Sequence, residues 1–437
     1  MRDGAFFRER RAAFVQAVGN GIAIVPTARE KFRNRDNAYP YRPDSYFWYL
    51  TGFPEPEAVL VVADGRSILF CREKDADREL WTGFRYGTEA AREVFGMDEA
   101  YPIGELANRL PELLLNRSAL WCALGMDSEW DTRILAALKA ARDLSHPGKC
   151  IPAHLHDWRE VLDMMRMVKD EAEIARMRRA AEITAAGHLQ ALKACQPGMM
   201  EYALEAELTH EFRRQGASGH AYNPIVAGGA NACVLHYTQN DRALADGDLV
   251  LIDAGCEFEG YAADITRTFP VNGRFTAAQK DCYEIVLAAQ AAAIAATRPG
   301  VFLNQPHEAA VRVLAQGMLD LGLLTGSLDG ILESHAYRPF YMHNTGHWLG
   351  LDVHDVGFLK RTDAEGRESW PELKPGMVLT CEPGLYIAAS PELPEAAAGL
   401  AGIGIRIEDD LLVAATGVEV YTHVPKSVAE IEAVMRT

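Results

Sequence analysis

The sequence has no long uninterrupted hydrophobic run. No segment reaches the roughly 18 apolar residues expected of a membrane-spanning helix. The first twenty residues mix charged with apolar side chains and lack the apolar core of a secretory signal. We therefore expect no membrane association and a cytoplasmic location.

Paired cysteines and an excess of basic residues are also missing. The eight cysteines are dispersed without a CxxC pair, so we expect buried, reduced thiols rather than a disulfide framework. The chain has 61 acidic against 44 basic residues, a formal charge of −17, which repels phosphate backbones and anionic membranes. Nucleic acid is thus not an expected partner, whereas divalent cations prefer such oxygen ligands.

The composition is that of an ordinary globular chain with more than one core. Its 437 residues exceed the roughly 250–300 at which one core stops growing, so we expect about two domains. Short β-branched runs (GIAIVP, EAVLVVADG, SILFC) precede helical spacing near 104–115 and 130–144, which predicts an α/β domain over 1–168.

A second domain is predicted over 169–437. Asp170 and Glu173 suit the capping box of a helix that ends before Pro197-Gly198. Amphipathic spacing predicts two more helices, over 283–297 and 306–324, and strand-like runs lie between and after them. We therefore expect an α+β fold in this half, without internal repeats.

The segment GDLVLIDAGCEFEGYAADITRTF predicts a β-hairpin. With the turn centred on Phe258 and Glu259, Asp253 would face Asp264, with β-carbons about 4.5–5.5 Å apart. Two carboxylates at that separation repel each other unless a cation or a shared proton lies between them. An isolated Asp is more often a solvated surface residue, but the preceding LVLI run indicates a buried strand. The hairpin therefore predicts a metal site.

Three of the thirteen histidines cluster in MHNTGHWLGLDVHDVG, namely His343, His347 and His354. A neutral imidazole can bind a metal, and other histidines orient substrate or move protons near neutral pH. A single histidine is more often structural. The residues alone do not decide which of the three would bind a metal.

Two further acidic residues follow strand-like text. Pro383 forces Glu382 into an extended conformation at the end of a strand. In GIGIRIEDDLLV, alternation places Arg406 and Glu408 on one face, where the arginine would keep a metal-bridging carboxylate ionised. The same pair could equally be a surface salt bridge.

Four acidic residues and one histidine from four separate segments suit two adjacent divalent cations better than one closed zinc site. Such sites clamp a hydroxide and polarise a carbonyl. Metal-assisted hydrolysis is the predicted reaction class.

These segments resemble the pita-bread metallopeptidase family and, within it, the Xaa-Pro aminopeptidases, also called aminopeptidase P. The resemblance covers most of the chain. It rests on LHYTQN, IDAGCEFEGYAADITRTFP, HNTGHWLGLDVHDVG, EPGLYI and GIGIRIEDD in the second half, and on YPYRPDSYFWYLTGFPEPEAVLVV and LWTGFRYG in the first.

The resemblance implies two metal ions, most often Mn²⁺, in a pita-bread catalytic domain. Asp253 would bind one ion, Asp264 and Glu408 would bridge both, and His347 and Glu382 would bind the other. A bridging hydroxide would attack the carbonyl carbon of the first residue, with Glu382 also accepting and donating the proton.

The resemblance assigns further residues to the substrate. His236 and His343 match residues that line the pocket, and His354 matches one that stabilises the oxyanion. Arg406 matches a residue that supports the ligands. The implied substrates are peptides with proline, which lacks an amide hydrogen, at the second position.

The first domain would serve oligomerisation and substrate access. In tetrameric relatives the position of Trp81 approaches a neighbouring subunit's active site, so the resemblance implies a dimer or tetramer. Core packing is the alternative for Trp81. The loop at 358–376 is longer than in the shorter bacterial pattern; its polar text predicts a surface excursion that could partly cap the cleft.

Three alternatives remain open. A prolidase, which cleaves Xaa-Pro dipeptides, has the same fold and metal set, although the first-domain segments favour the aminopeptidase. A metal-free binding protein on the same scaffold would be expected to lack ligands, and all five positions are filled here. A methionine aminopeptidase usually lacks the large first domain.

Overall fold

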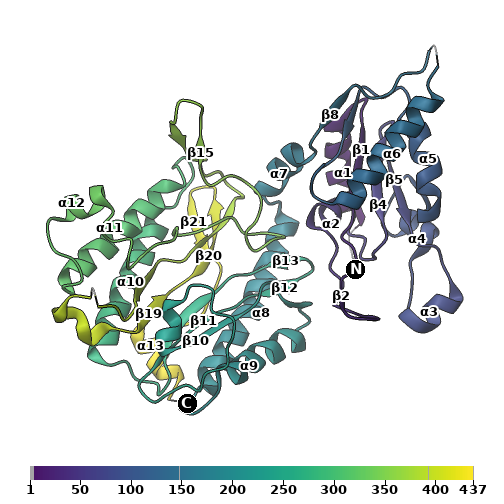
Figure 1. Cartoon of the computed structure of the whole chain (residues 1–437). Coiled ribbons are helices and arrows are strands. Elements are labelled where there is room, and N and C mark those ends of the chain that lie inside the picture. The colour runs from purple at the N-terminus through teal and green to yellow at the C-terminus, as the bar shows by residue number, and fades with distance from the viewer. Residues whose placement is uncertain (1–3, 147, 392, 437) are drawn as a thin grey trace. The chain divides into compact units, whose positions relative to one another are not determined.

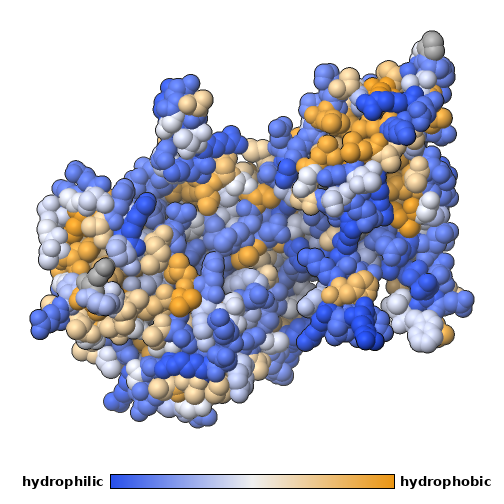
Figure 2. Space-filling model, in the orientation of Figure 1, coloured by the Kyte–Doolittle hydropathy of each residue, from blue (hydrophilic) through white to orange (hydrophobic). Residues whose placement is uncertain are grey.

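The structure, a computed structural model, describes residues 4–146, 148–391 and 393–436. The chain divides into two compact units, with the boundary between Met165 and Arg166. Within the described ranges, no helix has the length and apolar character needed to cross a bilayer. The space-filling view shows hydrophobic side chains interspersed among hydrophilic ones on the visible face (Figure 2).

The first unit is built on a six-stranded mixed sheet in the order β6-β5-β4-β1-β7-β8. Its strands are β1 (Ile22–Pro26), β4 (Val59–Ala63), β5 (Arg66–Cys71), β6 (Glu99–Pro102), β7 (Ala119–Trp121) and β8 (His154–His156), with a small separate hairpin of β2 (Phe32–Asn34) and β3 (Asn37–Ala38). Its helices are α1 (Gly4–Val18), α2 (Ser45–Thr51), α3 (Ala76–Thr82), α4 (Gly87–Glu93), α5 (Leu106–Leu113) and α6 (Ser128–Leu144).

The core of this unit lies between the central strands and the helices α5 and α6. Ile24, Val61 and Phe70 from the sheet pack in one cluster with Leu110 and Leu138 from these helices. The β-branched runs in the sequence are therefore buried strands, as predicted. Helix α7 (Arg159–Met167) then carries the chain into the second unit.

Helix α3 places its apolar side chains in solvent. Trp81 is 85% exposed and Leu80 is 83% exposed. The alternative of core packing for Trp81 is therefore wrong, because α3 has no buried residue.

The second unit surrounds curved strands with helices (Figure 1). Its helices are α8 (Glu171–Ala194), α9 (Glu201–Arg214), α10 (Ala277–Ala296), α11 (Asn304–Asp320), α12 (Leu328–Ser334) and α13 (Val428–Val434). Its strands are β9 (Gly219–His220), β10 (Ile225–Gly228), β11 (Leu249–Asp253), β12 (Cys256–Phe258), β13 (Tyr261–Ala262), β14 (Thr266–Pro270), β15 (Arg361–Thr362), β16 (Glu368–Ser369), β17 (Val378–Cys381), β18 (Gly384–Ile387), β19 (Ile403–Arg406), β20 (Asp409–Ala414) and β21 (Gly417–Val420).

Two helix starts follow capping chemistry. Asp170 caps α8 and forms the predicted capping box with Glu173. Thr276 and Gln279 form a second capping box, so α10 begins six residues before the predicted helix. The predicted α+β character of this half is confirmed.

The extra loop at 358–376 forms the short hairpin β15–β16, which projects from the second unit (Figure 1). Residues 361–369 are exposed, as the polar sequence predicted. The chain then enters β17, which leads to Glu382.

Candidate metal centre

The first acidic pair comes from the hairpin β11–β14. Asp253 faces Thr266, not Asp264, because the turn is centred on Glu259 and Gly260. Both turn residues have positive φ, 49° and 88°, which the tight hairpin turn requires and a glycine permits. The predicted direct facing of the two aspartates is therefore wrong by two residues, although Asp264 remains close to Asp253.

Tyr222 joins these two aspartates. Its buried hydroxyl lies 2.7 Å from Asp253 Oδ1 and 2.5 Å from Asp264 Oδ1. A hydroxyl has one proton, so it can donate to only one carboxylate at a time. The two negative charges therefore remain incompletely balanced by this contact.

Arg406 supplies a positive charge to Asp253. Its Nη2 lies 2.6 Å from Asp253 Oδ2, and its Nη1 donates to the Tyr386 hydroxyl at 3.0 Å. Burial raises the pKa of Asp253, but Arg406 and Tyr222 outweigh that effect and hold it below its usual value. Arg406 is 3% exposed, so the alternative of a surface salt bridge with Glu408 is wrong.

The second acidic pair is Glu382 and Glu408. Cys381 pairs with Asp409 on one side of them, and Gly384 pairs with Arg406 on the other. Because this register continues through the junction, Glu382 faces Glu408 across the two strands. A bridge between Thr266 and Glu408 joins this ladder to the first hairpin.

His347 lies between the two pairs. Its Nε2 is 3.5 Å from Asp264 Oδ2 and 3.6 Å from Glu382 Oε1, and its Nδ1 is hydrogen-bonded to the Trp348 carbonyl at 3.0 Å. Ligand atoms of Asp264, His347 and Glu408 all lie within 4.8 Å of one another. The structure thus brings the five predicted ligands to one place.

The electrostatics of this cluster fit a site for cations. Burial raises the pKa of Asp264 and Glu408, and neighbouring carboxylates add to it. Burial also raises the pKa of Glu382 to about 7, against the opposing effect of His347 and Arg406. Burial disfavours a charged His347, but Asp264 and Glu382 outweigh it and raise its pKa to about 9.

Two causes act together in these shifts, which are burial of the carboxylates and negative charge in excess of the positive charge that the surrounding side chains supply. A divalent ion would replace the His347 proton, since metal ligands are deprotonated. Carboxylate oxygens with one imidazole are the donors that hard and borderline cations accept. The residues therefore fit a metal centre.

The other predicted histidines surround the cluster. The His354 ring lies against the His347 ring, with centroids 4.0 Å apart and planes tilted by 37°, and His343 Nε2 lies 2.8 Å from the Tyr386 hydroxyl. Burial lowers the pKa of both His343 and His354 to about 4, so both are neutral. His236 is exposed on a loop of the second unit.

Three residues of the site escaped the sequence analysis. Tyr222 carries no local signal. Tyr386 follows Glu382 at a spacing of four, which places both on one strand face. Asp410 lies two residues after Glu408, is fully buried, and accepts the Asp264 amide hydrogen at 3.1 Å. Alternation along the two strands would have found the last two.

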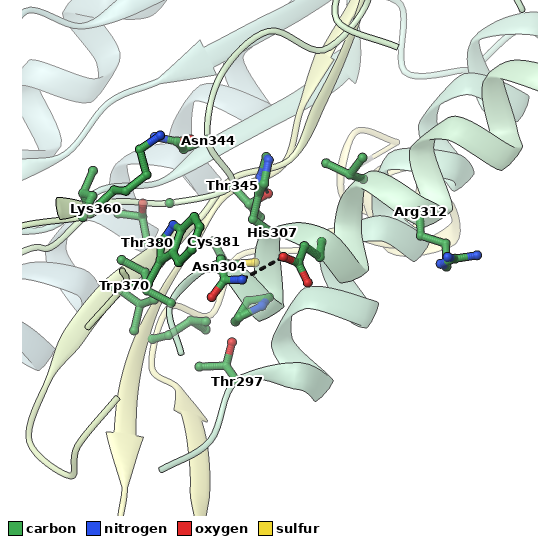
Figure 3. Close-up of a pocket in the computed structure, with 18 of the residues that line it drawn as sticks. Thr297, Asn304, His307, Arg312, Asn344, Thr345, Lys360, Trp370, Thr380 and Cys381 are labelled. Atoms are coloured by element: carbon green, nitrogen blue, oxygen red, sulfur yellow. Dashed lines mark hydrogen bonds between the residues drawn. The ribbon is translucent and has the colours of Figure 1, made fainter. Parts of the chain in front are cut away.

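A cavity of about 830 Å³ lies next to this cluster. Its walls include His307 and Arg312 of α11, Thr345, Thr380, and Lys360 and Trp370 of the long loop, and Figure 3 shows His307 directed at Thr345. None of the five clustered acidic and histidine side chains lines it. The candidate metal centre is therefore the cluster of acidic and histidine side chains, and not this cavity.

Comparisons with known proteins agree with this geometry. Residues 175–415 match the model of metallopeptidase family M24, and residues 7–121 match the aminopeptidase P N-terminal domain. The chain is 47% identical to Xaa-Pro aminopeptidase of Escherichia coli over 98% of this chain and 97% of that enzyme.

A solved structure and a more distant relative frame the comparison. The aminopeptidase PepP of Pseudomonas aeruginosa superposes with a TM-score of 0.96 at 47% identity, covering 99% of this chain and 98% of that one. Human Xaa-Pro dipeptidase is 33% identical over 98% of this chain and 91% of its own length. The chain therefore belongs to metallopeptidase family M24, in its Xaa-Pro aminopeptidase group.

Proposed function

We propose that this metallopeptidase removes the first residue from peptides whose second residue is proline. The observation that carries the proposal is the meeting of Asp253, Asp264, His347, Glu382 and Glu408 in one cluster, in which Asp264 and Glu408 are buried and the other three are partly exposed. The identity of 47% to an Xaa-Pro aminopeptidase, against 33% to a dipeptidase, supports the aminopeptidase over prolidase.

The proposed centre holds two divalent ions, with Mn²⁺ as the expected metal. Asp253 would bind one ion, His347 and Glu382 the other, and Asp264 and Glu408 both. Such ions supply a hydroxide nucleophile at neutral pH and polarise the scissile carbonyl. The contacts of His347 support its role, because its Nδ1 is hydrogen-bonded to the Trp348 carbonyl and its Nε2 lies toward Asp264 and Glu382.

Glu382 is the proposed proton carrier. It would accept the proton of the attacking water and pass it to the proline nitrogen as that nitrogen leaves as a secondary amine. Its backbone N–H donates to the Thr345 carbonyl at 2.7 Å, and Thr380 Oγ1 lies 3.4 Å from its Oε1. These contacts, one from the backbone and one to the carboxylate, support the proposal that Glu382 has a defined position for proton transfer.

The histidines and Arg406 complete the proposed site. A neutral His354 still has one N–H with which to donate to the developing oxyanion. His343, held by Tyr386, and His236 would line the substrate pocket. Arg406 would keep Asp253 ionised and oriented.

A manganese-loaded assay tests the function. Peptides of the form Xaa-Pro-Xaa, Xaa-Pro and Xaa-Ala-Xaa are compared, with release of the first residue as the readout. We expect Xaa-Pro-Xaa to be cleaved more efficiently than the other two peptides. Cleavage of Xaa-Pro dipeptides only would favour prolidase, and equal cleavage of Xaa-Ala-Xaa would contradict proline selectivity.

Metal analysis tests the centre itself. We expect about two divalent ions per chain and a strong loss of both metal and activity in Asp264→Asn. A protein without bound metal whose function survives Asp264→Asn would instead be a binding protein on this scaffold.

A homo-oligomer, dimer or tetramer, is part of the proposal. Leu80, Trp81 and Phe84 expose 83%, 85% and 67% of their surface, and clustered exposed apolar side chains typically mark interfaces. Trp81→Lys should lower the mass measured by light scattering, whereas an unchanged mass would remove this support.

A cytoplasmic location is also proposed, and the eight free cysteines support it.

A further inference from the structure

Arg166, Lys169 and Asp355 form a buried ion cluster in the second unit. Asp355 Oδ2 lies 2.9 Å from Lys169 Nζ, and its Oδ1 lies 2.6 Å from Arg166 Nη2. The three side chains are each 1% exposed. Arg166 also pairs with Asp352 at 2.7 Å, but that carboxylate is 40% exposed.

The cationic side of the cluster belongs to a fixed segment. The Lys169 N–H donates to the Gly376 carbonyl at 2.8 Å, and Val168 pairs with Met377 just before β17. The backbone of the segment that carries Lys169 is therefore held against the backbone that leads into Glu382.

The anionic side belongs to the loop that carries His354. The Asp355 N–H donates to the Trp348 carbonyl at 2.9 Å, which closes the loop. A β-carbon at Gly350 would lie 2.2 Å from Asp355 Oδ2, so the loop wraps closely around this carboxylate. Only a glycine fits there. The ring of His354, the adjacent residue, contacts the His347 ring with centroids 4.0 Å apart.

Stability alone is a poor explanation for such a cluster. Replacing all partners of a buried ion pair by apolar residues is often neutral or stabilising, so the presence of this cluster is weak evidence for a role in stability. Burial raises the pKa of Asp355, but Lys169 and Arg166 outweigh it and lower the net value, so the carboxylate stays ionised at neutral pH.

We propose that Asp355 is a positioning residue, which through Lys169 and Arg166 fixes the loop that aims His354 at the substrate carbonyl. This inference rests on the role that the proposed function gives to His354. It concerns how the loop is held and assigns no contact between Asp355 and substrate.

Kinetics of Asp355→Asn provide the first test, with Asp352→Asn as the matched control in the same loop and on the same arginine. Because a misplacement of about 1 Å can reduce the rate about 100-fold, we expect kcat to fall between about 10- and 100-fold. KM and metal content should stay near the wild-type values. Asp352→Asn should remain within about twofold. Equal effects of the two variants would overturn the proposal.

A double-mutant cycle with His354→Ala separates positioning from general damage. If Asp355 acts through His354, adding Asp355→Asn to His354→Ala lowers kcat no further. Multiplying effects would overturn the inference while leaving the proposed function intact. A His354→Ala variant with full kcat would instead overturn the role of His354 and, with it, this inference.

A charge-neutral pair covers the case in which Asp355→Asn folds poorly. Lys169→Met combined with Asp355→Asn removes the uncompensated ammonium, so the melting temperature should recover relative to Asp355→Asn alone. We expect kcat to remain low, because the ion pairs that hold the loop of His354 are still missing. Recovery of kcat together with the melting temperature would show a stability role only and overturn the proposal.

Discussion

Glu408 and Asp409 are neighbours in the chain and are both buried, at 1% and 0% exposure, yet the charges around them have opposite signs. Asp409 Oδ1 lies 2.7 Å from Arg267 Nη2, and its Oδ2 lies 2.6 Å from Lys426 Nζ. Burial raises the pKa of Asp409, but these two cations outweigh it and lower the net value. Asp409 is a completed structural anion.

Glu408 points to the other side of the strand. Its Oε2 accepts a hydrogen bond from the Thr266 hydroxyl at 2.6 Å, while Asp264 and Glu382 exert the strongest charge effects on it. No side-chain cation within the described ranges pairs with it. Burial and these carboxylates therefore raise its pKa. The comparison shows two different faces of the strand. On the face of Asp409, side-chain cations balance the negative charge, and we call it the complete face. On the face of Glu408, the negative charge is unbalanced and can accept a cation, and we call it the incomplete face.

The largest expected effect follows removal of charge from the incomplete face. Glu408→Gln should lower kcat/KM about 10³- to 10⁴-fold, because the metal term is worth several kcal/mol. Metal analysis should show reduced occupancy. The metal-free variant should melt at or above the temperature of metal-free wild type, since one like charge is gone. Destabilisation of the metal-free form would contradict the comparison.

The neighbouring change should do the opposite. Asp409→Asn removes the anion that pairs with the buried Arg267 and the partly exposed Lys426, so the free energy of unfolding should fall by about 3–5 kcal/mol. Urea titration measures the loss. Folded Asp409→Asn should still bind metal, and a variant that keeps its stability but loses metal would reverse the two assignments.

A second buried group without a metal role, His188 of α8, should show a defined pH response. This fully buried ring lies 2.9 Å from the Ala254 carbonyl, and burial lowers its pKa to about 4 from about 6.5. Its folded pKa is depressed, so its contribution is full above pH 6.5 and is lost as pH falls toward 4.

His188→Gln tests that response, because glutamine can still donate to the Ala254 carbonyl but does not titrate. Relative to wild type, the variant should lose about 3 kcal/mol less stability between pH 7 and pH 4. Denaturant titrations at both pH values give the comparison. Parallel losses in the two proteins would show that His188 is not the titrating group.

The smallest expected effect comes from a change of Arg406, the cation that pairs with Asp253 beside the cluster. Arg406→Lys keeps one charge but cannot contact both Asp253 and Tyr386 as the planar guanidinium does. Activity or metal affinity should fall about 10- to 100-fold. A loss as large as that of Glu408→Gln would indicate that Arg406 contacts the reacting groups directly.

Much of this site was predictable because strand alternation is a local property. Glu382 at a strand end and Arg406 with Glu408 on one face follow from sequence spacing alone. The turn of the first hairpin was placed one residue too early, since Gly260 rather than Glu259 takes the second central position. A turn shift of one residue moves every cross-strand partner by two.

Long-range contacts were not predictable from pattern. Tyr222 meets Asp253 and Asp264 only because the segment before β10 folds back on the hairpin, and no spacing encodes that approach. His347 likewise owed its selection among three histidines to family resemblance. The helices were better predicted, because capping and amphipathic spacing are written within a few residues.

The exposed hairpin β15–β16 is a suitable place to attach a label or an affinity tag. The contacts Lys360–Glu368 and Arg367–Asp363 join residues of the hairpin region to one another. Exposed tips of this kind tolerate insertion well. A fluorophore or affinity tag placed between Asp363 and Gly366 would therefore report on the molecule or immobilise it while leaving the buried carboxylates untouched.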